Sequence, residues 1–370
     1  MEKVRILMVI GKLEYCNGVT AYCMNYYRKI DHRRFAIDFA IHQELGAEDF
    51  AKDYYDEILG HGDRVFSFGD YGMKSMASLK KRAEALFDER HYDIVHVHVL
   101  NVAYFYLKPA KKKGIPVRIV HSHATKNSDN RIKRIRNHFL KEMGLRYCTN
   151  RIACSRLAGD YLFGQREYAV INNAIEYRKY SFDPESRIKV REKSGISDRT
   201  LFIGFVGRFA KQKNIRFILD ILNRLNRDEF DFKAVLIGNG PLKEEIERFI
   251  VQHHLNDRIV LMESCPDVHR YYSAMDVMVM PSFFEGLPVT GVEAQYADLK
   301  CLFSDKITRE VDFGKSVFLP IVNAEVWVEE IKKIAPYPRF EVVNDSFDID
   351  SQVSVLEDYY AGSLNKGVEK

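Results

Sequence analysis

Leu201–Val206, which reads LFIGFV, decides the fold because an alternation of strands and helices restarts there. Six apolar or glycine residues in a row, coming after a charge-rich segment, predict a strand buried on both faces. Short apolar runs then alternate with helical patterns towards the C-terminus, which predicts a parallel, doubly wound α/β sheet. The elements expected in this half are strands at 233–237, 258–262 and 276–280 and helices at 214–226, 241–253, 267–274 and 289–298.

A similar alternation occupies the N-terminal half. Its expected elements are strands at 5–10, 35–41, 65–68, 93–98, 117–121, 151–154 and 170–171 and helices at 18–29, 78–90 and 101–113. The polar residues 178–199, which lack a clear apolar period, separate the halves. We therefore expect Rossmann-like domains at 1–176 and 177–350, with a helix at about 351–370 packing back on the first. Such sheets bind ligands at the carboxyl ends of their strands, so a cleft between the domains is the expected site.

The bulk composition excludes several classes of protein. A net charge of +4 over 370 residues does not indicate a nucleic-acid binder. None of the six cysteines forms a CxxC pair or stands at metal-ligand spacing from a histidine, so we expect reduced thiols in a cytoplasmic protein. The N-terminal apolar run of about seven residues is too short for a signal peptide or a membrane span, and no later run approaches about 20. We expect a soluble or peripherally attached protein.

Two loops that follow strands carry groups suited to phosphate. Arg208 and Lys213 lie within one loop, and two cations there suit a diphosphate whose leaving charge must be stabilised. Two solvated surface bases fit the spacing equally well. Residues 237–241 read IGNGP, in which the glycines permit a tight turn and Pro241 leaves the helix amides free to face an anion. A merely structural turn at Gly238 is as compatible, because the third glycine of a dinucleotide fingerprint is absent.

The segment Met280–Gln295 reads MPSFFEGLPVTGVEAQ and combines two acids with a helix start. Glu285 lies in the loop after a strand, and Glu293 follows eight residues later on the helix. The amides near Val289 and Thr290 open that helix and form a ready phosphate seat. One carboxylate can accept hydrogen bonds from sugar hydroxyls while the other accepts from a ribose. An ordinary capped helix with solvent-facing acids fits the same spacing.

This segment resembles the EGxPxxxxEA motif, with its E-x7-E glutamate pair, of family 4 glycosyltransferases. The resemblance covers nearly the whole chain, in the family's order, through MVIGKLEYCNGVTAY (8–22), INNAIEYRKY (171–180), VGRFAKQKN (206–214), IGNGPLKEEIE (237–247) and AMDVMVMPS (274–282). The run AQYADLKCLFSDKITREVDF (294–313) is similar to the bacterial capsule and exopolysaccharide branch. The resemblance implies a GT-B fold, with two Rossmann-like domains facing an interdomain cleft. It also implies a retaining transfer from a nucleotide-sugar, bound by the C-terminal domain, to an acceptor bound by the N-terminal domain.

The resemblance also implies a role for each residue of the donor site. Arg208 and Lys213 would bind the donor diphosphate, Glu285 would contact the transferred sugar as a catalytic residue, and Glu293 would contact the ribose. The remaining donor contacts would be Asn17, Gly18, Gly238, Ser264, Cys265, Val289 and Thr290. Two positions depart from the family pattern, since Asn17 and Glu263 stand where glycine is common.

The histidines of the N-terminal half divide into two pairs. The family usually places a histidine that faces the donor sugar at the end of a strand, where this chain has His121 and His123 as catalytic candidates. Strand alternation would aim His121 at the flank of the sheet, which favours His123. Two strand-end histidines without a role are also compatible. His96 and His98 resemble a metal pair, but no carboxylate is suitably spaced, so we interpret them as strand residues.

The expected cofactor is none, and the expected metal is none. No DxD motif stands near the donor strands, and the Asp348–Asp350 string lies in the C-terminal connector. Arg208, Lys213 and a helix terminus would supply the positive charge instead. The branch suggests UDP as the nucleotide, with GDP and ADP open.

Two rival functions stay open. A GT-B epimerase or phosphorylase shares the fold, although no motif here marks a pyridoxal lysine. A catalytically degenerate protein that acts as an assembly partner in a glycan-synthesis complex is the second rival, against which the intact Arg208, Lys213, Glu285 and Glu293 count.

A basic helix suggests a membrane surface. Residues 131–146 read RIKRIRNHFLKEMGLR, and their apolar members at helical spacing are Ile132, Ile135, Phe139 and Met143. The basic residues 108–113, KPAKKK, could add to the same field. Such a helix can lie on an anionic membrane, and a surface helix packed on its own domain fits as well. The expected partners are a nucleotide-sugar, a lipid-linked glycan acceptor and an anionic membrane at the inner face of the cell membrane, with no nucleic acid.

Overall fold

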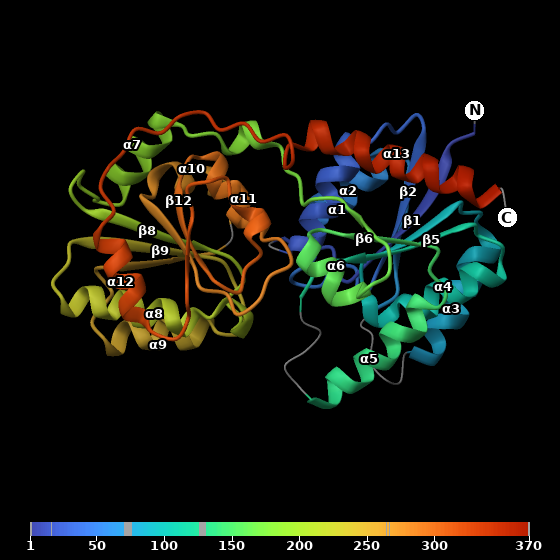
Figure 1. The fold of residues 1–370 in the computed structure, drawn as a ribbon, viewed down its shortest axis with the longest axis horizontal. Coiled ribbons are helices and arrows are strands. Elements are labelled where there is room, and N and C mark those ends of the chain that lie inside the picture. The colour runs from blue at the N-terminus through green and yellow to red at the C-terminus, as the bar shows by residue number, and fades with distance from the viewer. Residues whose placement is uncertain are drawn as a thin grey trace. The chain divides into compact units, whose positions relative to one another are not determined.

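The protein, seen in a computed structural model, folds into two compact units, Met1–Ala174 together with Ile349–Lys370, and Ile175–Asp348. The structure describes residues 2–15, 17–69, 76–125, 131–263, 265 and 267–368. Each unit is built on its own parallel sheet with helices around it (Figure 1). The boundary expected near Tyr177 falls within the first residues of the second unit.

The sheet of the first unit has the strand order β3-β2-β1-β4-β5-β6-β7, and all its pairings are parallel. Its strands are β1 (Val4–Ile10), β2 (Phe35–Ile41), β3 (Val65–Ser67), β4 (Ile94–Val97), β5 (Val117–Ser122), β6 (Asn150–Ala153) and β7 (Ala169–Val170). Its helices are α1 (Gly18–Lys29), α2 (Lys52–Gly60), α3 (Met76–Glu89), η1 (Leu100–Val102), α4 (Ala103–Lys112), α5 (Arg131–Leu145), α6 (Arg156–Phe163) and α13 (Ile349–Val368). The order reverses between β1 and β4, which is the switch point where doubly wound sheets bind ligands.

Alternate residues of β1 enter two separate cores, because successive side chains of a strand point to opposite faces. Ile6 belongs to the core that α1 and α13 cover, and Leu7 to the core that α3 and α4 cover. Helix α13 contributes Leu356 and Tyr360 to the first of these cores, and Figure 1 shows it lying over α1. The C-terminal residues therefore pack on the N-terminal unit.

The second unit has the strand order β10-β9-β8-β11-β12-β13, again with parallel pairings. Its strands are β8 (Leu201–Val206), β9 (Phe232–Ile237), β10 (Ile259–Met262), β11 (Val277–Met280), β12 (Lys300–Ser304) and β13 (Val317–Leu319). Its helices are η2 (Tyr177–Tyr180), α7 (Pro184–Lys193), η3 (Lys211–Lys213), α8 (Ile215–Arg227), α9 (Lys243–Gln252), α10 (Val268–Ala274), α11 (Val289–Tyr296), η4 (Arg309–Val311) and α12 (Ala324–Lys332). The doubly wound α/β class expected from the sequence is confirmed in both units.

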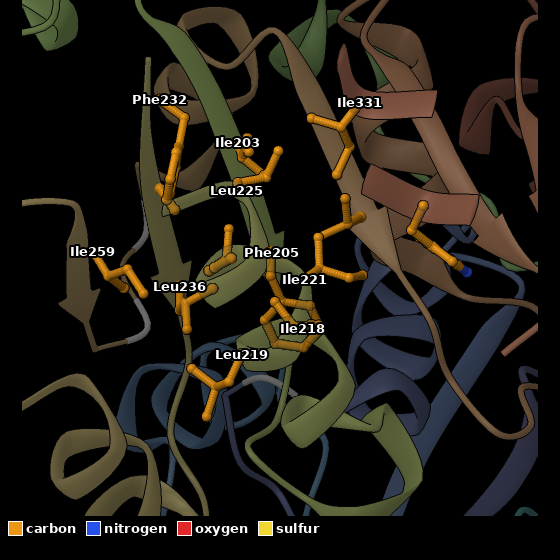
Figure 2. Close-up of a cluster of buried hydrophobic side chains, with 14 of the residues drawn as sticks. Ile203, Phe205, Ile218, Leu219, Ile221, Leu225, Phe232, Leu236, Ile259 and Ile331 are labelled. Atoms are coloured by element: carbon orange, nitrogen blue, oxygen red, sulfur yellow. The ribbon is translucent and has the colours of Figure 1, made fainter. Parts of the chain in front are cut away.

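The strand that decided the fold lies at the centre of the second core. Ile203 and Phe205 of β8 pack against Ile218 and Leu225 of α8, as Figure 2 shows. The spacing of the two α8 residues places them on one face of the helix. Burying each such side chain contributes about 1.5–3 kcal/mol, so this face fixes α8 on the sheet and holds the loop before it in place.

Part of the polar segment that separates the halves is a helix, which its lack of an apolar period did not predict. Helix α7 is attached by charge instead of by an apolar face. Arg191 of α7 is buried, and its guanidinium donates to Asp276 at 3.0 Å and to the carbonyl oxygens of Ala274 and Thr200. The sequence analysis expected no helix within 178–199, and the structure has one at Pro184–Lys193.

Helix α5 packs on its own unit through residues that include Leu140 and Gly144. The side chains of residues 131–135, which include Ile132 and Ile135, lie outside the described part of the chain. In the rest, Phe139 is 64% exposed, while Leu140 and Gly144 are buried. A Cβ added at Gly144 would come within 3.0 Å of Ala103, so this glycine brings α5 close to α4. The alternative in which the apolar stripe packs on its own domain is thus wrong at Phe139, and the membrane alternative stays a prediction. Among the described residues, no helix is long and apolar enough to cross a membrane.

Candidate active site

Glycines join the loops after β8 and β9 into one surface. Gly207, Gly238 and Gly240 have φ values of 154°, 155° and 152°, which side-chain-bearing residues rarely adopt. A Cβ at Gly238 would lie 2.0 Å from the carbonyl oxygen of Gly207. The amide of Phe209 donates to Asn239 O at 2.8 Å across the same contact. Close approach of two backbones therefore accounts for Gly238 and Gly240, and it fixes the loop that carries Arg208 and Lys213.

The loop after β8 also contacts the loop after β11. Lys213 Nζ donates to Glu285 Oε1 at 2.7 Å, and Gln212 Nε2 donates to Glu285 Oε2 at 3.2 Å and to Phe284 O at 2.9 Å. The amide of Phe283 donates to Gln212 O at 2.9 Å. Glu285 is only 7% exposed, so both of its oxygens are held by donors in a weakly solvated place. Two expected site residues are thus joined directly, although they stand 72 positions apart.

Arg208 differs from Lys213 in its surroundings. Its side chain is exposed, and within the described part of the chain no carboxylate forms an ion pair with it. A guanidinium in this position stays available for an anionic ligand.

Helix α11 begins shortly after Glu285 without a side-chain cap. Its N-cap is Pro288, which makes no capping hydrogen bond. The first amides of a helix have no partner within the helix, so those of Val289 and Thr290 can face an anion. The hydroxyl of Thr290 is buried and has no hydrogen-bond partner among the described residues. This helix start therefore offers donors for which the described part of the chain supplies no partner.

Glu293 lies further along α11 and is not a solvent-facing acid. Its Oε2 accepts from the hydroxyl of Tyr272 at 2.8 Å. Burial raises the pKa of Glu293, and hydrogen bonds from Tyr272 and Tyr180 act in the opposite direction. The alternative of an ordinary helix with two solvated acids is therefore wrong, because Glu285 is buried as well.

The loop after β10 is described only in part. Ser264 lies outside the described residues, whereas Cys265 is half-buried, and burial raises the pKa of its thiol. Glu263, which replaces the common glycine, accepts from Lys243 Nζ at 2.9 Å in an exposed ion pair.

In the first unit, Asn17 caps helix α1. Its Oδ1 accepts from the amides of Val19 at 3.0 Å and Thr20 at 3.3 Å, and its Nδ2 donates to Glu14 at 2.9 Å. Two amides that could have faced a phosphate are therefore already satisfied. No neighbouring atom requires a glycine at position 18, because a Cβ added there would meet nothing within 4 Å.

The four histidines at the ends of β4 and β5 form one cluster. His96 Nε2 lies 3.2 Å from His121 Nδ1, and His98 Nδ1 lies 2.8 Å from His123 Nε2. Residues two apart on each strand stack, with ring centroids 4.2 Å apart for His96 and His98 and 4.1 Å for His121 and His123. The sequence contained a signal for this cluster, since HVH and HSH both repeat a histidine at the strand period.

The cluster corrects two sequence-based arguments. His121 and His123 project to the same face, so alternation does not separate them, and the reason given for favouring His123 is wrong. Burial separates them instead, because His121 is buried and His123 is partly exposed. His96 and His98 are more than strand residues, since both belong to the cluster. Burial lowers the pKa of His96 and of His123 to about 3, and it lowers the pKa of His98 and of His121 well below the ordinary histidine value, which favours neutral rings at pH 7.

Comparison with known families gives two matches, one in each half of the chain. Residues 16–178 match the family described as Glycosyltransferase Family 4, and residues 186–334 match the family described as Glycosyl transferases group 1.

Curated relatives carry consistent names. The chain is 30% identical to the putative glycosyltransferase EpsF of Bacillus subtilis, over 98% of this chain and 97% of the relative. It is 26% identical to a UDP-Gal:alpha-D-GlcNAc-diphosphoundecaprenol alpha-1,3-galactosyltransferase of Escherichia coli, over 78% and 79%. It is 25% identical to the capsular polysaccharide biosynthesis glycosyltransferase CapH of Staphylococcus aureus, over 74% and 78%.

Solved structures share the fold at low sequence identity. HepE of Anabaena in complex with UDP and glucose aligns with a TM-score of 0.72 at 14% identity, over 99% of this chain and 98% of that one. Sucrose-phosphate synthase from Thermosynechococcus elongatus gives the same TM-score, identity and coverage. Both likenesses concern the GT-B architecture of two Rossmann-like units.

Proposed function

The chain belongs to the family 4 glycosyltransferases, in their bacterial capsule and exopolysaccharide branch, and on this premise we propose that it transfers a sugar from a UDP-linked donor, with retention of configuration, to a lipid-linked or growing surface polysaccharide. The name of the Escherichia coli relative supports both halves of this reaction, since it specifies a UDP-sugar donor and a diphosphoundecaprenol-linked acceptor. HepE, solved with UDP and with UDP-glucose, supports the choice of nucleotide.

The contact between Lys213 and Glu285 is the observation that carries the proposal. It joins a cation and a carboxylate at the carboxyl ends of β8 and β11, where open α/β sheets bind ligands. We assign the donor diphosphate to Arg208, Lys213 and the first amides of α11, the transferred sugar to Glu285, and the ribose to Glu293. In this assignment Lys213 lies between two anions, the carboxylate that it already contacts and the phosphate of the donor.

These residues account for the chemistry of the leaving group. Negative charge develops on the phosphate as the glycosidic bond breaks, and preorganised cations and helix amides stabilise that charge. The departing phosphate accepts the proton of the acceptor hydroxyl on the same face of the sugar, so this step uses no protein carboxylate as a base. A neutral His123 hydrogen-bonds the donor sugar. We expect turnover without an added metal ion, because Arg208 and Lys213 supply the positive charge at the diphosphate.

We extend the proposal to a peripheral location at the inner face of the cell membrane. Phe139 supports it, since an apolar ring that is 64% exposed on a basic helix is suited to an anionic lipid surface. Part of the neighbouring basic run is already paired, as Lys112 lies 3.7 Å from Glu84 and Lys113 contacts Asp88. The attraction of the protein to an anionic membrane would therefore depend mainly on α5.

Calorimetry and product analysis test the function together. The full-length chain should bind UDP more tightly than GDP or ADP, and it should release UDP from the correct UDP-sugar only when a lipid-linked acceptor is present. An inverted product, or hydrolysis without transfer, would contradict the proposed reaction. A chain that binds none of the three nucleotides would favour a degenerate transferase instead.

A further inference from the structure

The histidine cluster leaves buried polar atoms without partners. His98 Nε2 and His121 Nε2 are buried, and neither has a hydrogen-bond partner among the described residues. The hydroxyl of Tyr22, whose ring packs edge-on against His121 at 4.8 Å between centroids, is also buried and unpartnered. Each buried polar group left unsatisfied costs about 1–3 kcal/mol, so three in one cluster indicate a bound group.

The two histidines with unpartnered nitrogens belong to a set of three residues that can converge on one ion. His96, His98 and His121 each offer a ring nitrogen, and these three atoms lie within 4.8 Å of one another. Zinc–nitrogen bonds of about 2.0–2.1 Å place tetrahedral ligand atoms roughly 3.4 Å apart. Small rotations shared among the three rings would close the difference.

The hydrogen bonds around the cluster match those around bound metal ions. A ligating histidine normally donates its second ring N–H to an outer partner. His96 Nδ1 lies 2.8 Å from the hydroxyl of Tyr360, and His98 Nδ1 lies 2.8 Å from His123 Nε2. In both residues Nε2 is the nitrogen left for an ion. Only the 3.2 Å contact between His96 and His121, the longest in the cluster, would be exchanged for a metal bond.

We propose that His96, His98 and His121 bind one divalent transition-metal ion in the first unit, with Zn²⁺ the best match. Three imidazoles suit Zn²⁺, Co²⁺, Ni²⁺ and Cu²⁺, whereas Mg²⁺ and Ca²⁺ require oxygen ligands. Because the three ligands carry no charge, the fourth position takes water, hydroxide or an anionic group.

This ion would position a residue of the proposed transfer reaction. With Nε2 of His98 on the metal, its Nδ1 keeps the proton and donates to His123 Nε2. His123 then carries its own proton on Nδ1 and presents that N–H as a donor. The ion therefore acts on the tautomer of His123, and the diphosphate contacts of Arg208 and Lys213 stay as proposed.

Direct metal titration tests the proposal. Full-length protein freed of metal by a chelator is titrated calorimetrically with Zn²⁺ and, separately, with Mg²⁺. We expect one equivalent of Zn²⁺ to bind and no Mg²⁺. Titration with Co²⁺ should give the intense visible absorption of a four-coordinate site with nitrogen ligands. If the wild-type protein binds no Zn²⁺ and gives no such Co²⁺ spectrum, the cluster holds only water and the proposal is wrong.

Matched variants locate the ion. His98→Gln and His121→Gln should each weaken Zn²⁺ binding by at least about 100-fold, and Tyr360→Phe by about 10–100-fold. His42→Gln is the control, because His42 is equally buried in the same unit but belongs to a separate contact with Tyr106. Wild-type affinity in both His98→Gln and His121→Gln would place the ion elsewhere and overturn the assignment. Should these variants fail to fold, the wild-type Co²⁺ spectrum decides alone.

Discussion

Replacing Lys213 by alanine should separate the two functions that its ammonium group performs. The change removes the hydrogen-bonded cation 2.7 Å from the buried Glu285, while the weaker 3.2 Å contact from Gln212 stays. Hydrogen bonds to charged groups contribute about 1.5–3 kcal/mol, and breaking a fully buried pair costs about 3–5. Lys213 and Glu285 are 15% and 8% exposed, so we expect a loss of about 2–3 kcal/mol in the stability of the second unit.

The effect on catalysis should be larger than the effect on stability. Losing a group that stabilises developing charge lowers kcat by about 10²–10³-fold. Urea denaturation measures the stability change, and UDP release in the presence of acceptor measures kcat and KM at a temperature where the variant stays folded. The expected result is a folded protein with a loss concentrated in kcat.

Two further variants make this reasoning refutable. The control variant Lys332→Ala removes an exposed ammonium that lies 2.7 Å from Asp228 in the same unit. Such surface pairs contribute only about 0–1 kcal/mol, so this variant should change neither the stability nor kcat appreciably. Lys213→Ala with Glu285→Gln in one chain should recover part of the stability but none of the activity, because the buried side chain at position 285 then carries no charge. Wild-type turnover in Lys213→Ala would refute the site assignment, and an unchanged stability would refute the energetic role of the contact.

Four other outcomes follow from particular residues. Burial raises the pKa of Glu293, so its charged form opposes folding above its folded-state pKa. Glu293→Gln should therefore raise the melting temperature at pH 7, and this gain should disappear as the pH falls below the unfolded-state pKa of about 4.3. Calorimetry should show weaker donor binding by the same variant. Gly238→Ala should destabilise the second unit by about 3 kcal/mol or more in urea, because its φ of 155° and the 2.0 Å approach to Gly207 O leave no room for a Cβ. A Cβ added at Gly18 meets no atom within 4 Å, so Gly18→Ala should leave the stability unchanged or raise it by about 0.5–1 kcal/mol. A fall in the donor affinity of that variant would indicate that the substrate approaches position 18 closely. The protein should float with anionic vesicles at low salt and lose that binding in Phe139→Asp; an equal distribution of both proteins in the gradient would contradict the membrane proposal.

The elements and their order could be read from the chain because they depend on local periodicity. Apolar runs such as Leu201–Val206 are strands in the structure, and most expected boundaries agree within two residues. Helix α7 was missed for a physical reason: Arg191 attaches it through a buried ion pair to Asp276, and such a pair leaves no apolar period in the sequence.

The donor half of the site was also accessible from the sequence, through a motif whose residues stand close together. Glu285, Val289, Thr290 and Glu293 lie on one loop and the helix that follows, so their order along the chain fixes most of their arrangement. The contact between Glu285 and Lys213 could not be read in this way, since it depends on how β8 and β11 pair in the sheet.

The sequence by itself determined the two doubly wound units, the segment around Glu285 and the family to which the chain belongs, because each is written in local patterns of residues. Only the tertiary structure decided which distant groups meet. The register that pairs Val97 with Val120 brings His98 beside His121, and α13 adds the hydroxyl of Tyr360 from the other end of the chain. Each pair of histidines has an alternating pattern that specifies a strand face, but strand register is set by packing across the whole sheet. The cluster, and the two ring nitrogens that find no partner among the described residues, therefore exist only in the folded protein.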